Sequence, residues 1–464
     1  MEMKSFINDE EINACLNKQK NPDKKYISEI LEKAKDISHK GLSLEDTAAL
    51  LQCEDKELIA EMFFCAKEVK KRIYGNRMVL FAPLYVSNTC NNNCAYCGFR
   101  KDNKELVRKV LSYDEIKQEV EILEGIGHKR LLMVYGEVDY KPEWIVKTIE
   151  AAYSVKTPPS GEIRRINVNL APMDVEGFRI IKDAGIGTYQ SFQETYHCDT
   201  YKKVHLSGKK ADYLYRLYTM HRAMEAGIED VGMGALFGLY DYKFEVLALL
   251  QHCMQLEKDL GVGPHTLSFP RIEPAQGSSM SYNPPYAVSD DEFKKIVAIS
   301  RLAVPYTGMI ISTRERADLR KELLELGVSQ LSAASRVYPG AYKDYAINKH
   351  DTQQFTVGDE RSLDETIYDM VTNLDYIPSF CTGCYRKGRT GDHFMGLAKT
   401  SFINNFCTPN ALFTFAEYLR DYASLRTKEA GSALIKKIIN EDKAAAKAID
   451  NLKRIECGES DVFI

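Results

Sequence analysis

The sequence lacks the features that mark membrane, secreted and nucleic-acid-coating proteins. Its 464 residues have a mean hydropathy of −0.33, and no apolar run approaches the roughly 20 residues that span a bilayer. A net charge of −4 gives no global basic surface of the kind that drives sequence-independent nucleic-acid binding. The N-terminal segment MEMKSFINDEEINACLNKQK has no apolar core of a secretory signal. We therefore expect a cytoplasmic protein that binds neither membrane nor nucleic acid.

Three further absences bear on the fold. There is no low-complexity segment, no internal repeat, and no Gly-x-Gly-x-x-Gly turn after the first predicted strand, so a dinucleotide-binding open sheet lacks its fingerprint. What is present is an alternation of strand and helix patterns, about eight units over about 260 residues, which is typical of a (β/α)8 barrel. A doubly wound open sheet is the alternative. Barrel enzymes carry their chemistry at the C-terminal ends of the strands.

The alternation divides the chain into three predicted parts. Residues 1–76 read as an N-terminal helical extension, 77–340 as a TIM-type α/β barrel, and 341–464 as a C-terminal helical subdomain. Helix starts carry capping signals, in which a serine is followed three residues later by an acidic residue. They occur at Ser43, Ser112 and Ser289.

The 12 cysteines fall into two classes. Six are scattered, and in a long cytosolic chain we interpret them as buried thiols. The other six form two triads. Cys90, Cys94 and Cys97 follow the first predicted strand directly, and Cys381, Cys384 and Cys407 lie near the other end of the chain. Three thiolates leave a four-coordinate metal one ligand short.

The first triad favours either zinc or an iron–sulfur cluster, since both prefer soft thiolates. A cubane held by three cysteines leaves one iron open, which is what a catalytic metal needs. The alternative is a Cys3His zinc site completed by a remote histidine.

The second triad has a nearer competitor. His393 lies between Cys384 and Cys407 and would close a Cys3His zinc site, so spacing alone leaves zinc and a cluster both open. The loop also contains Arg386, Lys387 and Arg389. These side chains either offset the negative charge of a thiolate cluster or form an ordinary solvated basic loop.

The stretch SNTCNNNCAYCGFR, with Tyr96 before the last cysteine, resembles the signature of the radical S-adenosylmethionine (SAM) enzymes. This resemblance implies a SAM-binding [4Fe-4S] cluster on Cys90, Cys94 and Cys97 inside a radical SAM barrel. In that family the open iron chelates the amine and carboxylate of SAM, and one electron cleaves the sulfonium to give a 5′-deoxyadenosyl radical.

The resemblance extends to SAM-binding segments in barrel order. Gly136 and Glu137 in YGE resemble the segment that receives the SAM amino group, and Glu194 in FQET matches a ribose partner. Arg216 in YRLYT matches a SAM carboxylate partner, and Tyr96 belongs to the cysteine motif. Taken singly, each such charge is more often simply solvated. Their order along the barrel favours the SAM site.

Four later segments resemble the tyrosine-cleaving branch of this family: FQETYH, LSFPRIEPA, STRERADLR and SAASRVYPGAY. Two kinds of enzyme represent that branch, the thiazole-pathway tyrosine lyase (2-iminoacetate synthase) and the HydG-type maturase of [FeFe]-hydrogenase. Only the latter carries a C-terminal C-x2-C-x22-C, as this chain does.

The resemblance therefore implies a lyase that breaks the Cα–Cβ bond of L-tyrosine into p-cresol and dehydroglycine. The fragment would yield carbon monoxide and cyanide on an auxiliary [4Fe-4S] cluster, making an iron precursor for the hydrogenase H-cluster. We expect Ser312 and Arg314 to bind the tyrosine carboxylate, because a guanidinium binds carboxylates in bidentate fashion. The alternative is that Arg314 pairs with Glu315 or Asp318.

The resemblance also implies a fifth iron, bridged to the auxiliary cluster by free L-cysteine and ligated by a barrel histidine. His265 is our choice, although it opens the sixth predicted strand instead of ending it. Implied partners are Fe²⁺, a hydrogenase maturation scaffold protein and an electron donor. A non-catalytic iron–sulfur carrier is the rival class of function, and it would need no deep, shaped cavity.

Overall fold

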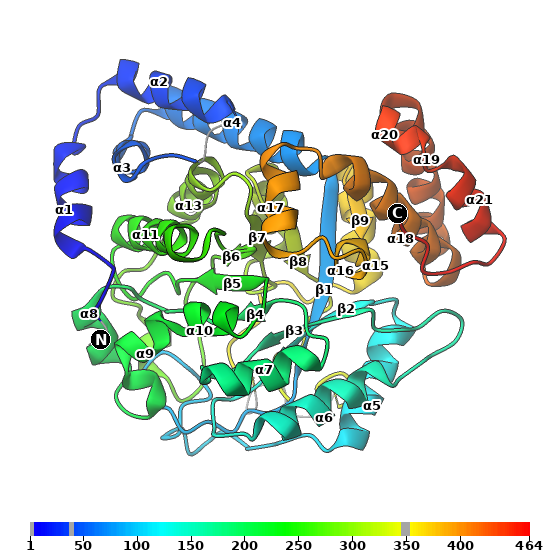
Figure 1. Ribbon diagram of the computed structural model, residues 1–464, viewed down its shortest axis with the longest axis horizontal. Coiled ribbons are helices and arrows are strands. Elements are labelled where there is room, and N and C mark those ends of the chain that lie inside the picture. Colours follow the sequence, from blue (N-terminus) through cyan, green and yellow to red (C-terminus); the bar gives the residue numbers. More distant parts are fainter. Residues whose placement is uncertain (1–3, 37–40, 345–352) are drawn as a thin grey trace.

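The computed structural model describes residues 4–36, 41–344 and 353–464. Four helices precede the first strand: α1 (Asp9–Lys18), α2 (Lys24–Lys35), α3 (Leu44–Gln52) and α4 (Lys56–Tyr74). The predicted capping box at Ser43 and Asp46 starts α3. Three of them pack on two barrel helices, α11 (Tyr242–Leu260) and α13 (Asp290–Ala303), and α2 packs on α3 and α4, at the upper left of Figure 1.

Eight parallel strands form a closed ring, because β1 pairs with both β2 and β8. The fold class predicted from the alternation is confirmed, and the open-sheet alternative is wrong. The strands are β1 (Arg77–Tyr85), β2 (Arg130–Val134), β3 (Arg165–Asn169), β4 (Tyr189–Gln190), β5 (Val231–Gly234), β6 (Thr266–Ser268), β7 (Gly308–Ile311) and β8 (Gln330–Ser332).

Helices surround the ring and cover its outer face (Figure 1). Capping boxes at Ser112 with Glu115 and at Ser289 with Glu292 start α5 and α13, as predicted. The helices are α5 (Tyr113–Gly125), α6 (Pro142–Tyr153), α7 (Val175–Asp183), α8 (Cys198–Val204), α9 (Tyr213–Leu217), α10 (Thr219–Glu225), α11 (Tyr242–Leu260), α12 (Ser279–Tyr282), α13 (Asp290–Ala303) and α14 (Ala317–Glu325).

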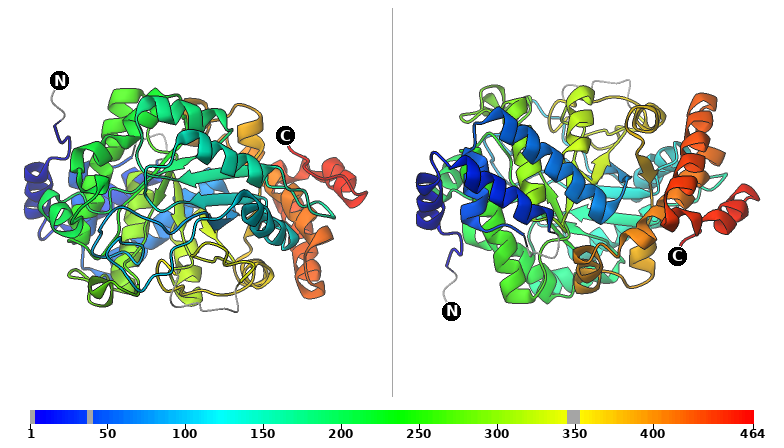
Figure 2. Two further views of the ribbon diagram at one scale, coloured as in Figure 1. Left: turned by 90° about the horizontal axis from the view of Figure 1, so that it is seen from below. Right: turned by 90° about the horizontal axis from the view of Figure 1, so that it is seen from above.

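The C-terminal part is mostly helical, as predicted, but it also adds a ninth strand, β9 (Ile377–Ser379), to the sheet. Sequence reasoning missed it because the strand has only three residues and contains Pro378, which lacks a ladder donor. The helices are α15 (Leu363–Leu374), α16 (Gly383–Arg386), α17 (Gly391–Lys399), α18 (Asn404–Asp421), α19 (Leu425–Glu441), α20 (Lys443–Ala446) and α21 (Ile449–Glu456). In both views of Figure 2 the last three lie on the side away from α1.

The ninth strand decides where the second cysteine triad lies. It runs parallel to the start of β1, with Arg77 opposite Ile377 and Val79 opposite Ser379. Cys381 follows two residues later and so lies at the N-terminal end of β1. The first triad follows the other end of the same strand. All nine residues of β1 are buried, and at 3.3 Å per residue they separate the two sites by about 26 Å.

A buried ion pair fixes α18 to the barrel. Arg164, directly before β3, places its two Nη atoms 3.0 and 2.6 Å from the carboxylate oxygens of Glu417. Lys129 Nζ lies 3.4 Å from the same carboxylate. Because α18 also carries Cys407, this pair helps to position the second triad. Among the described helices, none is both long and apolar enough to cross a membrane.

Candidate active sites at the two ends of the barrel

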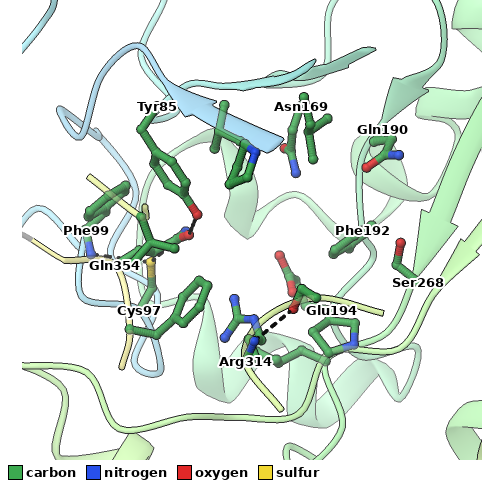
Figure 3. A pocket seen from close by; sticks show the side chains of 18 of the residues that line it. Tyr85, Cys97, Phe99, Asn169, Gln190, Phe192, Glu194, Ser268, Arg314 and Gln354 are labelled. Carbon is green, nitrogen blue, oxygen red and sulfur yellow. Dashed lines mark hydrogen bonds between the residues drawn. The ribbon is translucent and has the colours of Figure 1, made fainter. Parts of the chain in front are cut away.

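A cavity opens at the C-terminal ends of the barrel strands. The structure gathers there all ten residues predicted for the first cluster, SAM and the substrate carboxylate. They are Cys90, Cys94, Tyr96, Cys97, Gly136, Glu137, Glu194, Arg216, Ser312 and Arg314. The cavity is also lined by Asn169, Gln190 and Ser268, from the ends of β3, β4 and β6 (Figure 3).

The first cysteine triad lies in a largely buried loop. Within this loop the Asn93 side chain donates to Asp102 and accepts from Arg100. Burial raises the pKa of Cys90 to about 11 and also raises the pKa values of Cys94 and Cys97. Without a bound metal these thiols would be neutral at pH 7, and binding a cation would release their protons. Three soft sulfur donors fit the iron–sulfur cluster that the cysteine motif implies.

Gly136 brings the second strand against the cysteine loop. A Cβ at this position would overlap the carbonyl oxygen of Thr89, so only glycine permits this approach. Its N–H donates to Ser87 O at 2.9 Å, and the carbonyl of Glu137 accepts from Asn91 N at 2.9 Å. Glu137 is thereby fixed directly beside Cys90.

Two carboxylates and two cations form a network beside the triad. Arg216 Nη1 lies 3.0 Å from Glu137 Oε1, and Lys210 Nζ lies 2.6 Å from Glu194 Oε1 and 3.7 Å from Glu137 Oε1. Burial acts to raise the pKa of Glu137, but Arg216 and Lys210 outweigh it and hold that pKa below its usual value. Burial and Arg216 act to lower the pKa of Lys210, and the two carboxylates raise it instead. Glu137, Lys210 and Arg216 therefore stay charged at neutral pH.

Lys210 was missed by the sequence reasoning. It follows Lys209, and two adjacent lysines in a glycine-containing loop read as a solvated turn. In the structure Lys209 is exposed and pairs with Asp139, whereas the side chain of Lys210 is only 9% exposed. Only their surroundings in the folded structure distinguish Lys210 from Lys209.

Glu194 has an unusual backbone conformation, with a φ of +71°. Its carbonyl accepts from Leu236 N at 2.7 Å, in an isolated bridge to the segment after β5. A non-glycine residue held in this region marks strain that the surrounding structure maintains, often at a functional site. Tyr96 is likewise fixed, its hydroxyl 2.9 Å from His205 Nε2.

Arg314 does not form the ion pairs that were its alternative role. Glu315 binds Arg271, and Asp318 binds Arg316. The Arg314 guanidinium instead lies 3.3 Å over the ring of Phe355 and lines the cavity. Ser312 Oγ accepts from Arg314 N at 3.4 Å. This arrangement leaves the guanidinium facing the cavity, where it can bind an anion.

Glu273 is a second cavity residue that the sequence reasoning did not single out. It lies in the FPRIEPA segment after β6. Burial and the carboxylate of Glu315 raise its pKa to about 7, although Arg314 acts to lower it. A carboxyl group with this pKa can accept and release a proton at neutral pH.

The second cysteine triad lines a smaller cavity at the opposite end of the barrel. Cys381, Cys384 and Cys407 lie there together with His265. His265 precedes β6, at the N-terminal end of the barrel strands, and this is the end at which the triad lies. The position of His265 at the start of its strand is therefore the position that a ligand near this triad needs. Asp230 Oδ1 lies 3.3 Å from His265 Nδ1 and accepts from Gly391 N at 3.0 Å.

The surroundings of this cavity are cationic. Arg77, Arg130 and Arg389 line it, and the buried Nε atoms of Arg77 and Arg389 have no hydrogen-bond partner within the described residues. Burial raises the pKa values of Cys381 and Cys384. Gly383 N donates to Cys381 Sγ at 3.3 Å. Neutral thiols among unpaired guanidinium donors fit a bound group that carries net negative charge, as a thiolate-ligated cluster does.

His393 does not join the triad. It is exposed, and its Nδ1 lies 3.2 Å from the carbonyl oxygen of Gly388. The structure therefore does not assemble the predicted zinc alternative. Two arginines of the basic loop have different surroundings. Arg389 is buried at the cavity, whereas Arg386 pairs with Asp461 outside it.

Comparisons with known proteins agree with this geometry. The model of the radical SAM superfamily matches residues 84–253, and that of the biotin and thiamin synthesis associated domain matches residues 268–377. The 2-iminoacetate synthase of Salmonella typhimurium is 30% identical over 336 residues, 71% of this chain and 84% of the relative.

Two crystal structures of HydG, a maturase of [FeFe]-hydrogenase, match almost the whole chain. One is 48% identical with a TM-score of 0.95 and covers 99% of this chain and 100% of its own. The other, from Carboxydothermus hydrogenoformans, is 42% identical with a TM-score of 0.82 and covers 96% and 97%. Together with the two cysteine cavities, these matches show that the chain is a radical SAM enzyme and belongs to the family of the HydG maturases.

Proposed function

We propose that this enzyme cleaves the Cα–Cβ bond of L-tyrosine to p-cresol and dehydroglycine, and that dehydroglycine then yields carbon monoxide and cyanide. The atoms balance, since tyrosine divides into the two fragments and dehydroglycine equals carbon monoxide, hydrogen cyanide and water. These small products would be loaded with Fe²⁺ and L-cysteine into a precursor of the hydrogenase H-cluster. A maturation scaffold protein would receive that precursor.

In the first cavity Cys90, Cys94 and Cys97 would hold a [4Fe-4S] cluster. When bound, this cluster and SAM supply a 5′-deoxyadenosyl radical, using electrons from an external donor protein. The network of Glu137, Glu194, Lys210 and Arg216 offers both signs of charge to the zwitterionic methionine end of SAM and an acceptor to its ribose.

The substrate residues lie across the same cavity. Arg314 and Ser312 would bind the tyrosine carboxylate, because the guanidinium faces the cavity and forms no ion pair with Glu315 or Asp318. Glu273, with a pKa of about 7, would take a proton from the substrate amine or phenol. The closed ring of strands shields the radical from solvent.

In the second cavity Cys381, Cys384 and Cys407 would hold the auxiliary [4Fe-4S] cluster, and His265 would bind the iron that is loaded with products. Imidazole suits ferrous iron. Arg77, Arg130 and Arg389 would neutralise the anionic cluster and cyanide. The single observation that carries the HydG-type assignment is this second cavity, where three cysteines, a histidine and buried arginines converge.

The 2-iminoacetate synthase reaction is the alternative, because a relative with that name is 30% identical. It would end at dehydroglycine and would need no second metal site. A non-catalytic cluster carrier would need neither the SAM network nor the substrate guanidinium.

An anaerobic assay separates the three functions. The protein is reconstituted with iron and sulfide, given SAM, tyrosine and a reductant, and assayed for p-cresol and carbon monoxide. We expect both products. p-Cresol without carbon monoxide would indicate the synthase reaction, and the absence of both would indicate a carrier. The double variant Cys381→Ala/Cys384→Ala should lose carbon monoxide and keep p-cresol, whereas Cys457→Ala, at an exposed cysteine, should keep both.

A further inference from the structure

We propose that Gln354 is a positioning residue for the first cluster, which donates its amide N–H to the sulfur of Cys97 and thereby raises the reduction potential of the cluster. The inference rests on the proposed function, because it needs a cluster on the first triad. It concerns a side chain far along the chain from the cysteine motif, in the segment after β8.

Gln354 bridges a strand residue and a cluster cysteine. Its Oε1 accepts from the Tyr85 hydroxyl at 2.7 Å, so its Nε2 faces the cysteine loop and lies 4.0 Å from Cys97 Sγ. Figure 3 shows the two contacts in line from Tyr85 through Gln354 to Cys97. Because the tyrosine donates its proton to the amide oxygen, the orientation of the amide group is fixed.

The Cys97 sulfur receives a second donor from its own loop. Phe99 N donates to Cys97 Sγ at 3.4 Å, and Phe99 also packs edge-on against Tyr85, with ring centroids 5.9 Å apart. The main-chain donor is independent of the side chain at position 354. A variant of Gln354 without a side-chain N–H therefore removes one of the two donors to Cys97 Sγ. The main-chain donor of Phe99 stays in place.

The segment that carries Gln354 is tied to the barrel on both sides. Gln354 N donates to Val337 O at 3.1 Å, Thr356 N to Pro274 O at 2.9 Å, and Gly358 N to Thr313 O at 2.8 Å. It also lies against the cysteine loop, since a Cβ on Gly98 would come within 2.7 Å of Gln354 O. The amide is therefore held near the sulfur by main-chain contacts and not by its side chain alone.

The same segment supports the substrate side of the cavity. The ring of Phe355, the next residue, lies under the Arg314 guanidinium. One short segment thus contacts both a cysteine of the proposed cluster and the cation proposed to bind substrate.

A hydrogen bond to a cluster sulfur stabilises the reduced state more than the oxidised state, because the reduced cluster carries one more negative charge. Hydrogen bonds to the sulfurs are among the factors that set cluster potentials. Removing the amide donor should therefore make the cluster harder to reduce, while Cys90, Cys94 and Cys97 still hold it.

The test is a redox titration of the full reconstituted protein, followed by electron paramagnetic resonance, in which the first cluster is recognised by the change in its signal on adding SAM. We expect Gln354→Leu and Gln354→Met to shift its midpoint to more negative potential. The methionine keeps the approximate length of the side chain and adds no charge, but it has no N–H. Tyr85→Phe, which frees the amide to rotate, should give a smaller shift in the same direction. SAM cleavage by Gln354→Leu should slow with a weak reductant and recover with a stronger one.

Gln353→Leu is the matched control and should leave the midpoint unchanged. An unchanged midpoint in Gln354→Leu, or an equal shift in Gln353→Leu, would overturn the proposal while leaving the proposed function intact. Failure of the unaltered protein to form a SAM-responsive cluster would refute the proposed function itself. Should Gln354→Leu take up no iron, the midpoint of Gln354→Met decides.

Discussion

Each end of β1 lies near a triad of cysteines, and the two triads have different electrostatic surroundings. At the C-terminal end of β1 the triad lies beside two carboxylates and two cations in contact with one another. At the N-terminal end the triad lies beside Arg77, Arg130 and Arg389. Mixed charge suits a zwitterion such as the methionine end of SAM, and a purely cationic wall suits anions. If both triads hold the proposed clusters, the chemistry of each open iron would therefore be set by what surrounds the cysteines and not by the cysteines themselves.

The strongest test of the difference between the two ends is to disrupt one triad and to measure how much iron the other still binds. In Cys94→Ala we expect complete loss of 5′-deoxyadenosine and p-cresol, because the first cluster has lost a ligand. The iron content should fall to about half, since the second site lies about 26 Å away and shares no ligand with the first. Iron and sulfide analysis of the reconstituted variant checks this. Loss of nearly all the iron would mean that the two ends do not assemble independently.

The second triad depends on the packing of α18 against the barrel, because α18 carries Cys407. The first triad has no residue on this helix. Glu417→Ala leaves Arg164 buried, with its bidentate partner gone and with Asp461, at 3.2 Å, and Glu162, at 4.0 Å, as remaining acidic neighbours. Breaking a buried ion pair costs about 3–5 kcal/mol, and here the cost falls on α18 and Cys407. Urea unfolding should show this loss, with the iron of the second site lost first. Glu176→Ala removes a partner of the exposed Arg179 and should change stability by less than about 1 kcal/mol.

The histidine at the second end has no counterpart among the predicted ligands at the first, and the Asp230 carboxylate lies 3.3 Å from its Nδ1, where it would orient the ring. Removing an outer-shell carboxylate usually lowers metal affinity by about 10–100-fold. We expect Asp230→Ala to weaken Fe²⁺ binding by this factor in protein that already holds both clusters, measured by an iron-binding isotherm. Glu229→Ala, at the neighbouring acidic residue that contacts Thr390 at the surface, should bind iron normally. Equal affinities in both variants would contradict the role of Asp230.

Much of the fold was predictable from the sequence, because patterns within a few neighbouring residues determine where its helices and strands begin. Serine capping boxes started the helices at Ser43, Ser112 and Ser289 as expected, and the spacing of the cysteines marked two triads, each of which lines a cavity. The strand predicted directly before the first triad is β1, all nine residues of which are buried.

What sequence reasoning could not supply were relations between distant segments. Nothing local distinguishes Lys210 from Lys209, or predicts that Gln354 would reach Cys97. The position of His265 counted against it until β9 was seen to bring the second triad to the N-terminal end of β1. Pairing through a three-residue strand with a central proline leaves no periodic signal for sequence reasoning to detect.

Glu273 sharpens the comparison, because a titrating carboxyl group lines the first cavity and does not line the second. With a pKa of about 7, it is mostly protonated at pH 6 and mostly ionised at pH 8. If the carboxylate takes the substrate proton, p-cresol formation should rise about tenfold across this range. Glu273→Gln should be slower and nearly independent of pH, and Glu105→Gln, at an exposed position, should keep the original profile. Formation of 5′-deoxyadenosine without tyrosine should show no such rise, since no substrate proton moves. A rise that persists in Glu273→Gln would assign the titration to another group.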